Sequence, residues 1–129
     1  MQEAHFILYV RDRSESAAYY GRVLQLQPFL DVPGITEFRL LDGGILGIMS
    51  LEGAMRLLGQ ATFAGSAKAP KAELYLVVDD AEGHHRRALE HGASELSPMQ
   101  ERDWGHRAGY SVDGDGHVLA FAEKIAAGA

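Results

Sequence analysis

The chain has 129 residues, no cysteine and a formal net charge of −6 at pH 7, and its length suits a single domain. Without cysteine there is no disulfide, no thiolate metal site and no thiol nucleophile. The acidic charge disfavours nucleic acid as a partner, because phosphates bind basic surfaces. No apolar run is long enough to cross a membrane and the first residues lack a signal-peptide pattern, so we expect a cytoplasmic protein without a membrane partner.

The first half of the chain predicts a strand, a helix and three further strands. Residues alternate between two faces over Ala4–Val10, as in a strand. Asp12 stands three residues before Glu15, the spacing of a capping box, and is placed to begin a helix over Arg13–Leu24. Short strands separated by Pro-Gly and Asp-Gly-Gly turns follow over Gln27–Asp31, Ile35–Leu41 and Ile45–Ser50.

Residues 52–71 interrupt this pattern. Ala54–Gly59 can form a short helix, and the remainder is rich in small residues and turn formers. We predict a linker that can also serve as a lid. It separates module one, residues 1–51, from module two, residues 72–129, within one domain spanning residues 1–129.

The second half repeats the order of the first. A strand is predicted over Ala72–Asp79 and a helix over Ala81–His91, closed by Gly92 as a left-handed cap. The histidines of this helix are expected to face solvent. A short strand over Ser94–Ser97 precedes a hairpin, in which two Asp-Gly pairs join His106–Val112 to His117–Glu123.

Two copies of strand, helix and three strands form an internal repeat. The predicted fold is therefore α+β, with two tandem βαβββ modules. One helix can cover only one face of each sheet, so we expect the two curved mixed sheets to enclose a shared cleft with their other faces.

Five segments carry a resemblance to a known family. They are HFILYVRD from His5, the S-x-x-Y-Y-x-x-V-L-x-L pattern of Ser16–Leu26, LVVDD of Leu76–Asp80, HGA of His91–Ala93 and WGHRAGYSVDGDGHVL of Trp104–Leu119. Together they resemble the vicinal oxygen chelate superfamily, which includes glyoxalase I, bleomycin-resistance proteins, fosfomycin-resistance enzymes and extradiol dioxygenases. The resemblance covers essentially the whole chain and implies the same fold. Gln25 departs from it, because the superfamily usually has glycine there; a left-handed Gln25 would carry a strain of about 1 kcal/mol.

Metal-dependent members of the superfamily bind a divalent ion with one side chain from each of four strands. The resemblance places these positions at His5, Gly47, Glu73 and Ala120. Gly47 and Ala120 have no donor atoms, and a divalent ion needs three or more protein ligands. We therefore expect no metal and no other cofactor, with a divalent metal on His5 and Glu73 as the weaker alternative. Other donors are expected to lie away from this site: Glu37, His106, His117 and Glu123.

The small residues at these positions predict a wide, largely apolar cavity. Gly47, Ala120 and the neighbouring Ala122 would leave room between larger side chains. The expected lining is Ile7, Tyr9, Phe38, Met49, Tyr75 and Trp104. His5 and Glu73 would be its polar anchors, either contacting a ligand or forming an inert pair with each other.

Two functions of different classes follow from this prediction. The first is a metal-free binding protein that sequesters an aromatic or amphipathic compound such as an antibiotic, as some members of the superfamily do. The second is a glyoxalase-like lyase or isomerase, or a dioxygenase-related enzyme, using His5 and Glu73 with or without a divalent metal. Glu73 is the candidate catalytic base. The resemblance also implies a homodimer.

Overall fold

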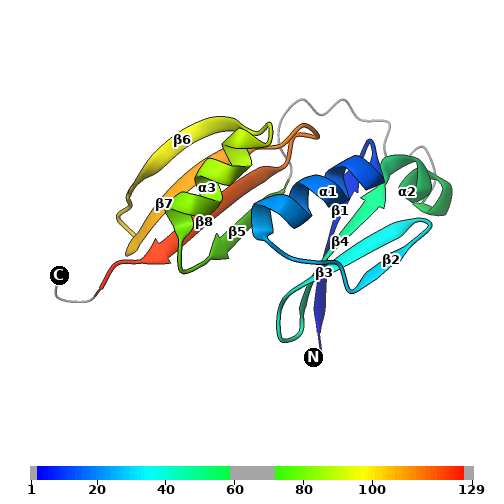
Figure 1. Cartoon of the computed structure of the whole chain (residues 1–129), viewed down its shortest axis with the longest axis horizontal. Helices are drawn as coiled ribbons and strands as arrows, with labels where there is room; N and C mark the ends of the chain where they lie inside the picture. Colours follow the sequence, from blue (N-terminus) through cyan, green and yellow to red (C-terminus); the bar gives the residue numbers. More distant parts are fainter. Residues whose placement is uncertain (1–2, 59–71, 127–129) are drawn as a thin grey trace. The chain divides into compact units, whose positions relative to one another are not determined.

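In the part of the chain that it describes, residues 3–58 and 72–126, the computed structural model has two four-stranded mixed sheets (Figure 1). One sheet belongs to the unit Met1–Ser66 and the other to the unit Ala67–Ala129. No helix within the described ranges is long and apolar enough to cross a membrane.

The first unit follows the predicted order, including a short helix after the last strand, which begins at Leu51 and not at Ala54 as predicted. Its elements are β1 (Ala4–Val10), α1 (Arg13–Leu24), β2 (Leu30–Val32), β3 (Ile35–Leu41), β4 (Gly44–Ser50) and α2 (Leu51–Leu58). The strand order is β1-β4-β3-β2, with β1 and β4 parallel and the other pairs antiparallel. The helix α2 occupies the start of the predicted linker, whose residues 59–71 lie outside the described ranges.

The second unit repeats this topology. Its elements are β5 (Glu73–Val77), α3 (Ala81–Glu90), β6 (Ser94–Glu101), β7 (His106–Val112) and β8 (Val118–Lys124). The strand order is β5-β8-β7-β6. As in the first unit, the strands that come first and last along the chain, β5 and β8, are parallel neighbours, and the other pairs are antiparallel. The predicted α+β class and the repeated βαβββ module are therefore confirmed.

The strand β6 is longer than predicted, because it continues through Pro98 to Glu101 instead of ending at Ser97. Proline lacks a backbone N–H, so it is tolerated in a strand at the edge of a sheet, which is where β6 lies. The register between β6 and β7 shifts on either side of Ser97, as expected where a β-bulge bends an edge strand.

The helix ends agree with the local signals in the sequence. The carboxylate of Asp12 accepts a hydrogen bond from the Glu15 N–H at 2.9 Å, which confirms the predicted cap of α1. Gly92 has φ +115° and ends the second-unit helix as predicted. At the end of α1, Gln25 is left-handed, with φ 57° and ψ 45°, and the following Leu26 N–H bonds to the Gly21 carbonyl at 3.1 Å.

Each sheet has one face against its long helix. In the first unit the Phe38 ring packs on Gly21 of α1 and is 1% exposed. In the second unit the rings of His84 and Phe121 pack at 5.0 Å, and His85 is 5% exposed beneath α3. The expectation that the α3 histidines face solvent is wrong for His85, because the helix turns it toward the sheet, where its Nε2 meets Glu95 at 2.8 Å.

Gln25→Gly should stabilise the protein by about 1 kcal/mol, because glycine adopts the left-handed conformation without the Cβ strain that a non-glycine residue carries. Chemical denaturation monitored by circular dichroism measures this change. Gln27→Gly is the matched control: Gln27 does not have a positive φ, so the same replacement there only adds chain entropy and should not stabilise. Equal effects of the two variants would contradict the prediction.

The β7–β8 turn contains a histidine whose charge is held by the fold. The Asp113 carboxylate accepts from the N–H groups of Asp115 and His117 at 2.9 and 2.8 Å, and its second oxygen lies 3.1 Å from the His117 Nδ1. The hydrogen bond to Asp113 raises the pKa of His117 above 6.5 despite its partial burial.

The folded state holds the His117 proton more tightly than the unfolded state. The contribution of the His117–Asp113 pair to the free energy of unfolding is therefore fully present below pH 6.5. The contribution should disappear as the pH rises through the folded pKa. Denaturation of the wild-type protein and of His117→Gln between pH 5 and 9 should give a difference in unfolding free energy that is largest at the acidic end. A difference that is constant or grows with pH would show that the ion pair is not responsible.

Candidate functional site

The face of the second sheet opposite α3 carries an aromatic cluster, which we define as Tyr75, Trp104, His106 and Tyr110. The strand register sets Tyr75, Ala120 and Tyr110 side by side on β5, β8 and β7. The two tyrosine rings are 6.4 Å apart, and the side chain of Ala120 between them is fully buried. A small residue at this position lets the two large rings lie together.

The Tyr75 hydroxyl links the cluster. It lies 2.9 Å from the Trp104 Nε1 and 2.6 Å from the His106 Nδ1, and the Tyr75 and His106 rings stack at 5.7 Å. An indole N–H can only donate, so the Tyr75 oxygen accepts from Trp104. In the tautomer that carries the ring proton on Nε2, the Tyr75 hydroxyl donates to the His106 Nδ1. The chain of hydrogen bonds fixes the orientation of three rings.

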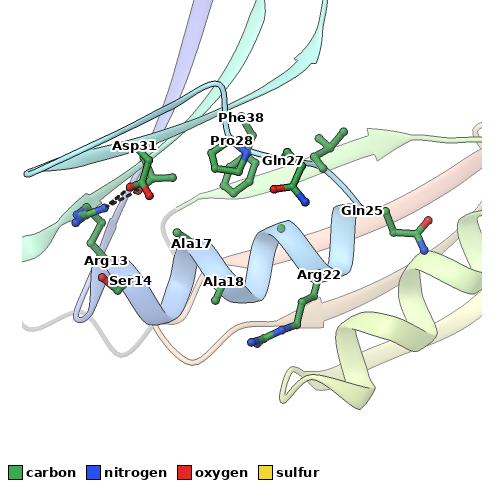
Figure 2. A pocket seen from close by; sticks show the side chains of 13 residues that line it. Arg13, Ser14, Ala17, Ala18, Arg22, Gln25, Gln27, Pro28, Asp31 and Phe38 are labelled. Atoms are coloured by element: carbon green, nitrogen blue, oxygen red, sulfur yellow. Dashed lines mark hydrogen bonds and ion pairs between the residues drawn. The ribbon is translucent and has the colours of Figure 1, made fainter.

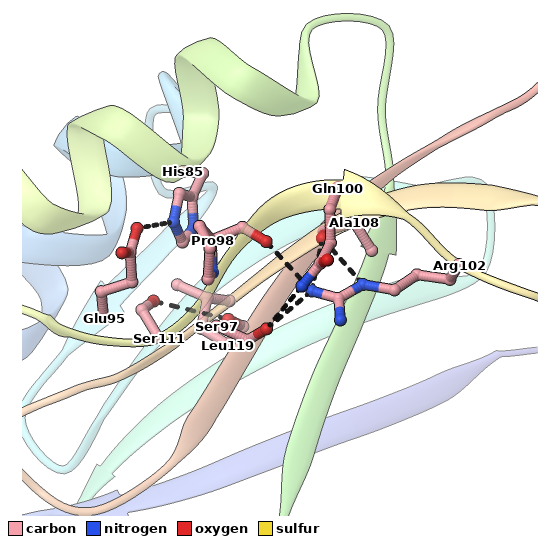
Figure 3. Close-up of polar contacts among 9 residues, drawn as sticks. All are labelled: His85, Glu95, Ser97, Pro98, Gln100, Arg102, Ala108, Ser111 and Leu119. Atoms are coloured by element: carbon pink, nitrogen blue, oxygen red, sulfur yellow. Dashed lines mark hydrogen bonds and ion pairs between the residues drawn. The ribbon is translucent and has the colours of Figure 1, made fainter.

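Arg102 supports the cluster from its edge. Its guanidinium bonds to the Ala108 carbonyl at 2.9 Å, the Ser97 hydroxyl at 2.9 Å and the Pro98 carbonyl at 3.0 Å (Figure 3). These bonds hold it 5.2 Å above the Tyr110 ring, within the range of a cation–π contact.

Tyr110 is the member of the cluster whose ionisation the surroundings change. Burial raises the pKa of Tyr110, the negative charge of Glu73 and the neighbouring Tyr75 raise it further, and Arg102 opposes the shift. Tyr110 is therefore a neutral phenol at physiological pH. Glu73 itself is exposed on the same face of the sheet.

In the first sheet, the face opposite α1 brings an unexpected acid to His5. The register sets Glu37 beside Gly47 and Gly47 beside Ile7, so Glu37 shares a face with His5. The two ring nitrogens of His5 meet two carboxylates, Glu3 at 2.8 Å from Nε2 and Glu37 at 3.3 Å from Nδ1. The hydrogen bond to Glu3, with a smaller contribution from Glu37, raises the pKa of His5.

Several expected site residues take other positions or surroundings. Phe38, expected in the cavity lining, lies on the opposite side of its sheet, against α1. Gly47 does not open space: a Cβ added there would be 2.9 Å from Ile7 Cδ1 and 3.4 Å from Ile35 Cδ1, so two isoleucine side chains already cover it. Within its own unit, His5 pairs with Glu3 and Glu37, which the sequence analysis did not expect; the pair of His5 with Glu73, which belong to different units, stays a prediction.

The remaining expected residues lie on the faces opposite the long helices, as the alternation predicts. In the first sheet these are His5, Ile7, Tyr9 and Met49. In the second sheet they are Glu73, Tyr75, Ala120 and Ala122. Trp104 joins the second group through its hydrogen bond to Tyr75.

Glu37, His106, Arg102 and Tyr110 are site residues that the sequence analysis missed or placed elsewhere. One of them had a usable signal. His106 stands two residues before Ala108 and four before Tyr110 in one strand, so alternation puts all three on one face. Glu37 had none. The Asp42-Gly43 turn pairs Leu41 with Gly44, and continuing that register would set Glu37 opposite Ile48, but a register shift between Arg39 and Leu41 sets it opposite Gly47.

The residues at the superfamily's metal positions do not fit a metal ion. Gly47 and Ala120 offer no donor atoms, and the Ile7 side chain lies over Gly47. Within residues 3–58 and 72–126, no group of three or more histidine, aspartate or glutamate side chains is arranged to hold a metal. His5, which does have donor atoms, has its two ring nitrogens next to the Glu3 and Glu37 carboxylates, in separate pairs and not in a chelate.

The family model of the Glyoxalase/Bleomycin resistance protein/Dioxygenase superfamily matches residues 3–121. The chain belongs to this superfamily. A comparison with curated proteins gives no match.

Solved structures of similar fold come from several bacteria. A glyoxalase/bleomycin resistance protein/dioxygenase family enzyme from Burkholderia phytofirmans PsJN has a TM-score of 0.81 at 19% identity, covering 94% of this chain and 97% of that one. A glyoxalase-related enzyme from Fulvimarina pelagi has a TM-score of 0.79 at 23% identity, covering 98% and 93%. TioX from Micromonospora sp. ML1 has a TM-score of 0.66 at 20% identity, covering 95% and 98%. At these identities the likeness shows a shared fold.

Replacing Tyr75 with Phe tests whether its hydroxyl organises the cluster. The variant removes the acceptor of the Trp104 N–H and the donor to His106, and should lower the unfolding free energy by about 1 kcal/mol. The indole ¹H–¹⁵N resonance should move; it is unambiguous because the chain has a single tryptophan. Tyr110→Phe is the control, because Trp104 bonds to the other tyrosine. An unmoved indole resonance in Tyr75→Phe would contradict the described network.

Proposed function

We propose that this protein binds and sequesters an aromatic or amphipathic small molecule, such as an antibiotic, without a metal ion. The observation that carries the proposal is the aromatic cluster, in which hydrogen bonds hold three rings in place. The superfamily itself contains both binding proteins and enzymes, so membership alone does not choose between them.

The cluster has the physical properties of a stacking surface for a flat ligand. Trp104 is 52% exposed although its N–H is already bonded to Tyr75, so its ring can be covered without losing a hydrogen bond. Aromatic side chains bind planar molecules through apolar burial and offset stacking. Because the rings are already oriented, little rotamer entropy remains to be lost when a ligand binds.

Glu73 suggests the character of the ligand's polar group. Its carboxylate is exposed on the same sheet face as Tyr75 and influences Tyr110 electrostatically. A carboxylate beside aromatic rings favours a cationic group attached to an apolar body. We expect the preferred ligand to carry an amine or another positive charge.

The second candidate function is a glyoxalase-like lyase or isomerase, or a dioxygenase-related enzyme. The pairing of His5 with Glu37 favours it, because a nearly buried carboxylate (9% exposed) held near an imidazole can transfer a proton. In this alternative Glu37 or Glu73 would abstract a proton next to a carbonyl group. Binding without conversion remains the first proposal, because it needs only the oriented rings. Proton abstraction also needs a group that stabilises the resulting oxyanion, and Arg39, in the same row of the sheet as His5, has its guanidinium over the Phe29 ring.

The deciding experiment measures binding and conversion together. A panel of planar aromatic antibiotics, with and without an amine, is screened by thermal shift and by quenching of Trp104 fluorescence. Each compound that binds is incubated with the protein and recovered for mass spectrometry. Sequestration predicts binding with the compound recovered unchanged, whereas catalysis predicts a product that accumulates over repeated turnovers.

Variants test whether the compounds bind at the aromatic cluster. Tyr75→Ala should weaken binding about tenfold, equal to ~1.4 kcal/mol, and Glu73→Gln should weaken the binding only of compounds that carry an amine. Val32→Ala, in another sheet, is the control. Unweakened binding in Tyr75→Ala would disprove the proposed platform.

Metal content is tested on the same preparations. Elemental analysis follows incubation with nickel, zinc, manganese and iron(II), for the wild-type protein and for His5→Ala. Stoichiometric metal that is lost in the variant would overturn the metal-free proposal and support the enzymatic one. We also propose a cytoplasmic homodimer, which sedimentation velocity tests for its oligomeric state.

A further inference from the structure

A cavity of about 700 Å³ lies in the first unit between α1 and the chain that leads into β2 and β3 (Figure 2). Its floor is formed by Thr36 and Phe38, each 1% exposed. Ala17 and Gly21 of α1 form one wall, and Pro28 faces them from the other side. The cavity is therefore on the helix side of its sheet, away from the face that carries His5 and Glu37.

The internal repeat explains why space exists here. Asp12 and Asp80 cap the two long helices in the same way, which makes Ala17 the counterpart of His85. In the second unit His85 is buried and its Nε2 bonds to Glu95 of β6 (Figure 3). In the first unit the methyl group of Ala17 takes the place of the His85 imidazole, and β2 has three residues where β6 has eight. The space that His85 and β6 fill in the second unit is therefore left open in the first.

The polar end of the cavity contains an arginine that is already oriented. The Arg13 Nη1 donates to the Thr36 hydroxyl at 2.6 Å and to the Asp31 carboxylate at 3.0 Å, and Thr36 donates to Asp31 at 2.9 Å. Among the described residues, no acceptor bonds to the Arg13 Nε or Nη2. The guanidinium is thus held in position while its other N–H groups remain available to a ligand.

Arg13 is the cation that the cavity presents. Asp31 pairs with one side of its guanidinium, whereas the Arg22 side chain points away from Phe38 and Pro28 in Figure 2. An anion therefore fits the N–H groups of Arg13 that Asp31 and Thr36 leave free. The volume lies within the range of sites for small organic molecules, about 300–1,000 Å³. Ala17 and the exposed Pro28 give an apolar surface next to the cation, so the cavity combines one charged end with an apolar part.

We propose that this cavity is a second binding site, for a small organic monoanion whose carboxylate or sulfonate meets Arg13. Its aromatic or aliphatic body lies between Ala17 and Pro28, above the buried Phe38. The site differs in ligand charge from the aromatic cluster, where Glu73 favours a cation. It also involves different residues, so binding at the cavity and binding at the aromatic cluster can be tested separately.

The test uses 8-anilinonaphthalene-1-sulfonate, an aromatic sulfonate, and N-phenyl-1-naphthylamine, which has the same rings without the charge. The full chain is titrated with each probe by ¹H–¹⁵N NMR. The sulfonate should shift the backbone amides of residues 13–38 saturably. Saturable shifts of residues 73–122 alone would place the probe on the second unit and overturn the assignment, as would no saturable shift at all.

Two variants address the two halves of the cavity. Ala17→Leu fills the apolar part and should weaken the sulfonate about tenfold or more. Arg13→Gln should weaken the sulfonate by a similar factor while leaving the uncharged probe unchanged, which a general loss of folding would not do. Trp104→Phe is the control, because it alters the aromatic cluster and not the cavity. Unchanged sulfonate affinity in both cavity variants would overturn the proposal.

Discussion

The parallel pairing of the first and last strands within each unit is the constraint on which the rest of this structure depends. It places β1 beside β4 and β5 beside β8, so residues separated by some 40 positions become neighbours in one row. Side chains alternate between faces with a period of two, and a register change of one residue would exchange the two faces of a strand. The neighbours Tyr75, Ala120 and Tyr110 exist only in this register.

The two βαβββ modules share a topology but differ in how the helix packs on the sheet. In the second unit, His85 of α3 fills the space between helix and sheet and contacts Gly109 and Glu95. In the first unit the small Ala17 leaves a cavity beside the helix. The faces opposite the helices also differ, since one carries a linked group of aromatic rings and the other a histidine between two carboxylates. Repeating a fold therefore repeats the backbone arrangement but not its chemistry.

Packing occupies Gly47 and Ala120, two of the positions at which the family resemblance places metal ligands. Gly47 lies under two isoleucine side chains, and Ala120 lies between two tyrosines. A donor side chain introduced at either position would have to displace groups that are already in contact. The hydrogen-bonded and stacked rings of the second unit support the proposed capture of an organic molecule, whereas the His5–Glu37 pair supports the enzymatic alternative.

The sequence by itself determined the features that depend on near neighbours. The alternation of Ala4–Val10, the Asp12 cap and the Asp-Gly turn before β8 all follow from local geometry, and the repeat and the family resemblance then determine the topology. Glu37 could not be placed in this way, because the register shift between Arg39 and Leu41 changes its partner from Ile48 to Gly47. Only the tertiary structure decided that Phe38 faces α1, that Ile7 covers Gly47, that Pro98 lies inside an edge strand and that Ala17 borders a cavity. These facts depend on how side chains distant in sequence share a limited volume, and no local pattern encodes that packing.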